Sequence, residues 1–176
     1  MASIFRQIGL TFVVVIVCVA LHEVGHLIAA KALGYEAVIR MNSVSLVGGA
    51  TNWRDDVIVD AAGPLVTLLF ALVGLALSNR ENALGATMVF AALMMRVLAA
   101  VISLNMPNDE ARISELLGLG TWTLPAIAVA LLAIIMGLSA RRSGVGSAWL
   151  RGAWIGASLG FVVVVFGEPY LPAITV

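Results

Sequence analysis

Two histidines and a glutamate stand in an otherwise apolar stretch near the start of the chain, LHEVGHLIA at residues 21–29. Residues four apart on an α-helix lie on one face, about 6 Å apart along the axis, so His22 and His26 can both direct a ring nitrogen at one metal ion. Glu23 projects beside them, close enough to deprotonate a water on that ion. The spacing H-E-x-x-H therefore predicts two zinc ligands and a general base, the arrangement found in metalloproteases.

These polar side chains are costly to place in lipid unless each has a partner. The alternative to a metal site is structural: the histidines hydrogen-bond to neighbouring helices, and Glu23 pairs with a cation such as Arg96, which itself lies in an apolar segment. Cys18 precedes His22 by one turn but lies about 12 Å from His26 along a helix. Zinc bonds of about 2.0–2.3 Å cannot span that distance, so we expect Cys18 to be a packing residue.

Catalytic zinc usually has three protein ligands and one position for water, so another segment must supply the third ligand. Asp109 is the best candidate, because it follows a segment broken by Pro107, and unwound backbone at membrane depth can line a polar cavity. Glu110 is the close alternative. Asn105 and Asn108 flank the break and can hydrogen-bond to the ligands or to a substrate.

The elements that must position these residues are membrane helices. Of the 176 residues, 61% are hydrophobic and 11% are charged, and the mean hydropathy is +1.06, values that a soluble domain does not reach. We expect an integral, multi-pass protein of the cell membrane, in contact with the lipid bilayer. Ten basic residues balance ten acidic ones without a basic run, which argues against a nucleic-acid partner.

Five apolar segments are long enough to cross a bilayer, which needs about 20 helical residues; they are 8–33, 57–78, 83–105, 121–139 and 147–167. The predicted fold is an all-α membrane protein with about five transmembrane helices in a single domain, 1–176. Its catalytic core covers about 8–118, and accessory helices cover about 119–170. A cleaved signal peptide is an alternative for the N-terminus, but the helical pattern continues past His26 to Ala32.

Between the first two segments, residues 37–53 partly alternate β-branched and polar side chains and contain Met41-Asn42-Ser43 and Gly48-Gly49. This pattern indicates a short β-hairpin. Water must reach the metal from the hairpin's side, because about a dozen apolar residues separate His22 from the N-terminal end of its helix. We expect Gly48 and Gly49 to line that cleft, and the hairpin edge to pair with an extended substrate strand.

The last segment carries a repeat of small residues, Gly152, Gly156 and Gly160. Glycines at this spacing let two helices approach closely. Packing within the chain is one interpretation, and a homodimer seam is the other.

With these residues in place, the sequence resembles the site-two protease family of intramembrane zinc metalloproteases. The similar segments are HEVGHLIAAKALG at 22–34, LVGGA at 46–50, AGPLV at 62–66 and LNMPND at 104–109. They are similar to the family's H-E-x-G-H helix, its glycine-containing strand, its A-G-P segment and its N-x-x-P…D-G segment. The likeness covers roughly residues 10 to 115, and Glu110 stands where the family usually has glycine.

This resemblance implies hydrolysis of peptide bonds in membrane proteins or peptides, within or next to the bilayer. It also implies one zinc ion bound by His22, His26 and Asp109, with Glu23 as the base. Two other functions stay open: a catalytically inactive relative that binds membrane proteins through the same cleft, and a metal transporter, for which the spans offer few further ligands.

Two indications of the orientation in the membrane disagree. The basic residues on the N-terminal side are Arg6, Arg80, Arg141, Arg142 and Arg151, and those on the side of the predicted site are Lys31, Arg40, Arg54 and Arg112. The positive-inside rule slightly favours a cytoplasmic N-terminal side, whereas the family likeness favours a site that faces the cytoplasm.

Overall fold

The computed structural model describes residues 2–176, and in this part of the chain the fold is almost entirely helical. The helices are α1 (Ala2–Ala32), α2 (Trp53–Leu77), α3 (Leu84–Ile102), α4 (Asp109–Leu116), α5 (Thr123–Ser143), α6 (Ser147–Gly167) and a final turn of 3-10 helix, η1 (Glu168–Tyr170). Five of them are long and apolar enough to span a bilayer, at positions close to the predicted segments. The chain is therefore a multi-pass, all-α membrane protein, as the sequence predicts.

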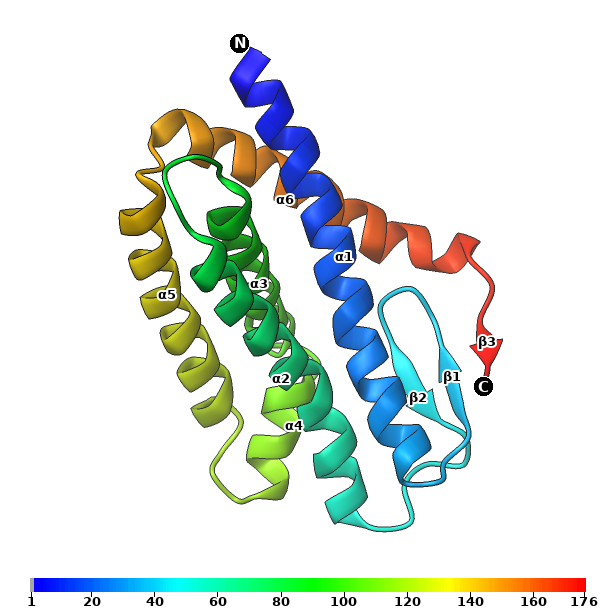
Figure 1. Ribbon diagram of the computed structural model, residues 1–176. Helices are drawn as coiled ribbons and strands as arrows, with labels where there is room; N and C mark the ends of the chain where they lie inside the picture. Colours follow the sequence, from blue (N-terminus) through cyan, green and yellow to red (C-terminus); the bar gives the residue numbers. More distant parts are fainter. Residues whose placement is uncertain (1) are drawn as a thin grey trace.

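Helix α1 runs the length of the molecule and organises the rest (Figure 1). Helix α6 crosses its N-terminal half, α2 and α3 pack along it, and α5 packs on the far side of α3. Residues such as Val15, Val89 and Ala92 fill the centre of this bundle. Cys18 is buried there with its Sγ 3.9 Å from Met95 Sδ, so its predicted role as a packing residue is confirmed.

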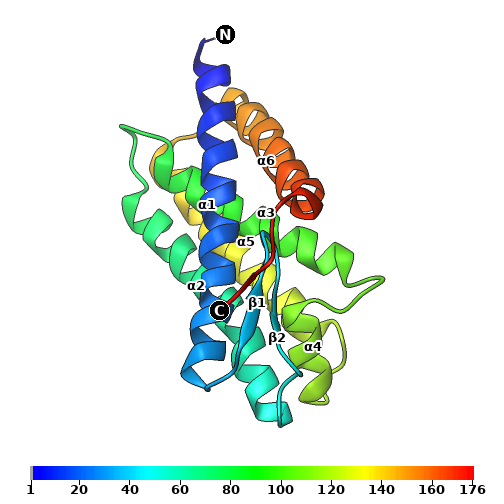
Figure 2. The same cartoon turned by 90° about the vertical axis from the view of Figure 1, so that its right-hand side faces the viewer.

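A small sheet lies beside the C-terminal half of α1 (Figures 1 and 2). Strands β1 (Ala37–Ile39) and β2 (Val44–Leu46) form the predicted hairpin, and β3 (Ile174–Thr175) adds to the other side of β1, giving the order β2-β1-β3. The turn of the hairpin is formed by residues 40–43. Gly48 and Gly49 instead follow β2, where both have a positive φ (80° and 75°). Met41-Asn42-Ser43 and Gly48-Gly49 thus mark the turn and the end of the hairpin.

The outer edge of β2 has free backbone groups. Arg40 N donates to Ser43 O and Val47 N donates to Glu36 O, so residues 43, 45 and 47 of this arm point their backbone groups at β1. Because direction alternates along a strand, the N–H and C=O groups of Val44 and Leu46 point away from the sheet. Val44 and Leu46 border a cavity of about 650 Å³ together with residues of α2 and α4.

The glycine repeat of the last span packs against α1 of the same chain. Added Cβ atoms at Gly152, Gly156 and Gly160 would come within about 3 Å of residues 4–15 of α1. The small residues therefore allow α6 to lie directly on α1. These contacts agree with packing within the chain, the first of the two interpretations of the repeat, and a homodimer stays a prediction.

The break after the third span occurs as predicted. Helix α3 ends at Ile102, the chain turns through Pro107, and Asn108 caps α4 by accepting a hydrogen bond from Asp109 N (3.0 Å). The cap fixes where α4 begins, and so brings Asp109 and Glu110 into its first turn with both side chains buried.

Candidate metal centre

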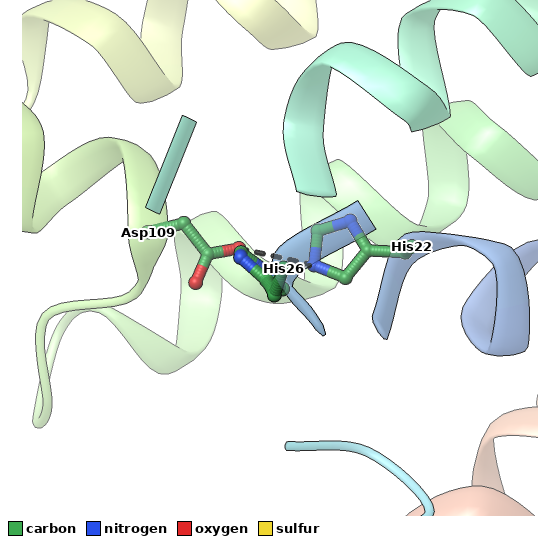
Figure 3. A group of neighbouring side chains, drawn as sticks. All are labelled: His22, His26 and Asp109. Atoms are coloured by element: carbon green, nitrogen blue, oxygen red, sulfur yellow. Dashed lines mark hydrogen bonds and ion pairs between the residues drawn. The ribbon is translucent and has the colours of Figure 1, made fainter. Parts of the chain in front are cut away.

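His22, His26 and Asp109 converge on one point between α1 and α4 (Figure 3). His22 Nε2 lies 3.0 Å from His26 Nε2 and 3.1 Å from Asp109 Oδ2, and His26 Nε2 lies 3.6 Å from the same oxygen. All three side chains are buried, with exposed fractions of 3–6%. Two residues of one helix and a third from a segment 83 positions further on are thus brought together as the sequence predicts.

The outer nitrogens of both imidazoles have hydrogen-bond partners on α2. His26 Nδ1 lies 2.7 Å from Val59 O, a group that can only accept, so Nδ1 carries the proton. His22 Nδ1 lies 3.0 Å from Thr67 Oγ1, whose own proton goes to Gly63 O (3.1 Å). We therefore assign both protons to Nδ1, which leaves the Nε2 lone pairs directed at Asp109.

This arrangement fits a divalent metal ion. Two nitrogen lone pairs and a carboxylate oxygen are all acceptors, and such atoms repel one another unless a cation or proton lies among them. Donor atoms about 2.0–2.2 Å from a tetrahedral ion are roughly 3.3–3.6 Å apart, close to the observed 3.0–3.6 Å. Two imidazoles and one carboxylate are also a ligand set that zinc prefers in catalytic sites.

Two glycines let α2 approach α1 closely enough to reach the imidazoles. A Cβ at Gly25 would lie 2.9 Å from Ala62 O, and one at Gly63 would collide with the rings of His22 and His26. These glycines belong to the H-E-x-G-H and A-G-P segments of the sequence. Their small size is what lets Thr67 and Val59 reach the outer nitrogens.

Asp109 is fixed from its other side by an ion-pair chain. Arg112 Nη2 lies 3.1 Å from Asp109 Oδ1 and 2.6 Å from Asp60 Oδ1. The hydrogen bond with Asp60 raises the pKa of Arg112 above its usual range, so this guanidinium stays charged. Arg112 thus holds Oδ1 of Asp109, while Oδ2 faces the imidazoles, where it could bind an ion.

Glu110, the alternative third ligand, forms an ion pair with Arg96. Its Oε1 and Oε2 lie 3.0 and 3.1 Å from Arg96 Nη1, and it does not belong to the metal-binding group. Arg96 also lies 3.3 Å from Asp109 Oδ2. The acidic partners that Arg96 needs are thus Glu110 and Asp109, so the structural alternative in which Arg96 pairs with Glu23 is wrong.

A cavity of about 220 Å³ opens over the three ligands. The buried side chain of Glu23 lines it, as do Asn42, Ser43 and Val44 of the hairpin and Phe161 of α6. In and beside this cavity, four carboxylates face only two guanidinium groups; they are those of Glu23, Asp60, Asp109 and Glu110 against those of Arg96 and Arg112. Carboxylates therefore outnumber guanidinium groups around the cavity.

The predicted substrate-binding residues lie in different places. Asn108 lines the cavity, although its side chain also caps α4. Asn105 is exposed on the α3–α4 loop and does not line it. Gly49 lines a neighbouring cavity of about 650 Å³ that shares Val44 and Val59 with the first one, and Gly48 lines neither. The hairpin residues that border the ligands are those of its turn.

The residues that hold these three side chains in place were not predicted from the sequence. Thr67 and Val59 hold the imidazoles, and Asp60 and Arg112 hold Asp109. A signal exists for Thr67, a hydroxyl side chain on an apolar helix close to the A-G-P segment. A backbone carbonyl such as that of Val59 leaves no trace in a sequence.

Compared with protein-family models, curated proteins and solved structures, the chain matches none of them. The function is therefore argued from the chemistry of the site.

Proposed function

We propose that this chain is a membrane-embedded zinc endopeptidase of the site-two protease type. The observation that carries the proposal is the convergence of His22 Nε2, His26 Nε2 and Asp109 Oδ2 in a buried cavity. These three residues would hold the ion. Zinc bound there would supply a Lewis acid that lowers the pKa of water to about 7 and polarises a carbonyl group.

Glu23 is proposed as the general base. It follows His22 directly on α1, and its carboxylate lines the same cavity. It takes a proton from the attacking water as the new C–O bond forms at the scissile carbonyl. When the C–N bond breaks, Glu23 returns that proton to the leaving amine. One water is consumed, and the products are a carboxylic acid and an amine.

The substrate is proposed to bind as an extended strand along β2. A helix hides its peptide bonds in its own hydrogen bonds, whereas an added strand exposes them. The outward backbone groups of Val44 and Leu46 supply such an edge, and Val44 borders both cavities. Five membrane-spanning helices around the site point to substrates that are membrane proteins or membrane-associated peptides, and we place the chain in the cell membrane.

The deciding experiment compares the wild-type chain with Glu23→Gln, both purified in detergent. Glutamine keeps the shape of glutamate but cannot take the proton, and a general base contributes about 10²–10⁴-fold to rate. We expect both proteins to contain one zinc ion per chain. Cleavage of single-span peptides in ¹⁸O-water should place one ¹⁸O in each new carboxyl group with the wild type only.

Two results would count against the proposal. A wild-type chain without stoichiometric zinc refutes the metal site, and full cleavage by Glu23→Gln refutes the role of Glu23. Zinc without any cleavage across the peptide panel would favour the catalytically inactive binding protein.

A further inference from the structure

Two adjacent carboxylates begin α4, but only one of them faces the imidazoles. Arg96 Nη1 lies 3.0 Å from Glu110 Oε1 and 3.3 Å from Asp109 Oδ2. One guanidinium nitrogen contacts both side chains. A change of rotamer would therefore bring the Glu110 carboxylate to the position of the ion. Glutamate binds zinc with the same chemistry as aspartate. Some feature of the fold must therefore keep Glu110 away from the ion.

Arg96 has the properties needed to keep Glu110 away from the ion. Its side chain is only 4% exposed, and its Nε is buried without a hydrogen-bond partner. A buried guanidinium without water depends on its counter-ion, and breaking a buried ion pair is strongly destabilising. Glu110 contributes both carboxylate oxygens to Arg96, whereas Asp109 contributes one at a longer distance. Moving Glu110 to the ion would take from Arg96 its closer anion.

We propose that the buried Arg96–Glu110 pair selects Asp109 as the third metal ligand. Arg96 is a positioning residue: it holds Glu110 back and also contacts Asp109 Oδ2, the oxygen that faces the imidazoles. Glu110 in turn balances the charge of Arg96, which would otherwise compete with the ion for Asp109. This inference rests on the proposed function, because it presupposes a metal bound by His22, His26 and Asp109.

The test is a gain of metal binding, which a merely structural pair would not produce. In the full-length chain in detergent, Co²⁺ is titrated and followed by its visible absorption. Asp109→Ala should bind Co²⁺ at least tenfold more weakly than the wild type. Adding Arg96→Gln to Asp109→Ala frees Glu110, and the affinity should rise at least tenfold again. A third change, Glu110→Gln, should abolish that recovery.

If the double variant does not fold, metal binding by the single variant Glu110→Gln tests the inference instead. Glu110→Gln alone leaves the charge of Arg96 directed at Asp109, and altered outer partners of metal ligands typically weaken metal binding 10–100-fold. Glu115→Gln, an exposed carboxylate on the same helix, is the matched control and should bind as the wild type does.

The outcomes separate this inference from the proposed function. A wild-type chain that binds no Co²⁺ overturns both. A wild-type chain that binds Co²⁺ normally, together with no recovery in the double variant, overturns the selection by Arg96 and leaves the peptidase proposal standing. If the double variant is unfolded, wild-type affinity in Glu110→Gln overturns the inference.

Discussion

Thr67 offers a test of the site at the scale of one atom. Its hydroxyl accepts the Nδ1 proton of His22, so Thr67→Val removes an oxygen and leaves a buried N–H without an acceptor. We expect zinc affinity to fall 10–100-fold, the usual effect of losing such a partner. The measurement is competitive zinc titration with a chelating dye.

Thr87→Val is the matched control for this change. Thr87 is equally buried and accepts a hydrogen bond from Gln7, between α1 and α3. Both variants lose a buried hydrogen bond, so both are expected to lose stability, but only Thr67→Val should lose zinc. Equal weakening of zinc binding in the two variants contradicts the assigned role of Thr67.

Individual residues differ in how far the sequence predicts them. His22, Glu23 and His26 follow from spacing on one helix, because α-helical geometry is fixed locally. The choice of Asp109 over Glu110 does not follow, since it depends on how Arg96, on another helix, is rotated. The same holds for Thr67 and Val59, which are placed by the rotation of α2 about its axis.

At the scale of helices, the contact between α1 and α2 depends on Gly25. A Cβ there would lie 2.9 Å from both Ala62 O and Val66 Cγ2, so Gly25→Ala must push the helices apart. Overpacking of this kind costs about 1–3 kcal/mol, and here it also withdraws Thr67 and Val59 from the imidazoles. We expect a lower unfolding temperature in detergent together with weaker zinc binding.

Gly9→Ala on the same helix is the control, because an added Cβ meets nothing within 4 Å there. Alanine favours a helix over glycine by about 1 kcal/mol, so this variant should be as stable as the wild type or more so, with unchanged zinc affinity. A similar zinc defect in both variants would show that the close α1–α2 contact is not what matters.

The free edge of β2 gives a prediction for substrate binding. Val44→Pro removes an outward-pointing N–H but keeps the pairing of the hairpin with β1, since proline is tolerated at sheet edges. We expect KM for a peptide substrate to rise at least about tenfold, roughly the effect of losing one or two hydrogen bonds. Zinc content should be unchanged; normal KM would exclude pairing through Val44.

Elements were predictable where a long run of residues defines them. The five spans follow from about 20 apolar residues each, and the hairpin follows from its alternation. Strand β3 has only two residues and exists because it meets β1 from 135 positions away.

For the whole molecule, the carboxylates that outnumber the guanidinium groups around the cavity would couple binding of the proposed metal to assembly. Removing zinc with a chelator leaves these charges uncompensated, so the attachment of α4 to α1 should weaken. A ligand present at 1,000 times its Kd stabilises by about 4.1 kcal/mol, and that contribution should vanish. We expect a lower unfolding temperature and faster hydrogen exchange in residues 109–116, with α3 and α5 unaffected.

The chelator should lower the unfolding temperature of Glu23→Gln by no more than it lowers that of the wild type, because Glu23 is proposed as a base and not as a ligand. A chain whose unfolding temperature is the same with and without the chelator would contradict the coupling between zinc and the docking of α4.

The surplus of carboxylates around the cavity also leads us to expect that the amount of this protein in a cell depends on zinc. During zinc starvation, newly made chains would still insert their five spans, but α4 would stay loosely attached and accessible to the proteases that remove unfinished membrane proteins. The amount of this protein would then follow the supply of zinc, independently of how strongly its messenger is transcribed.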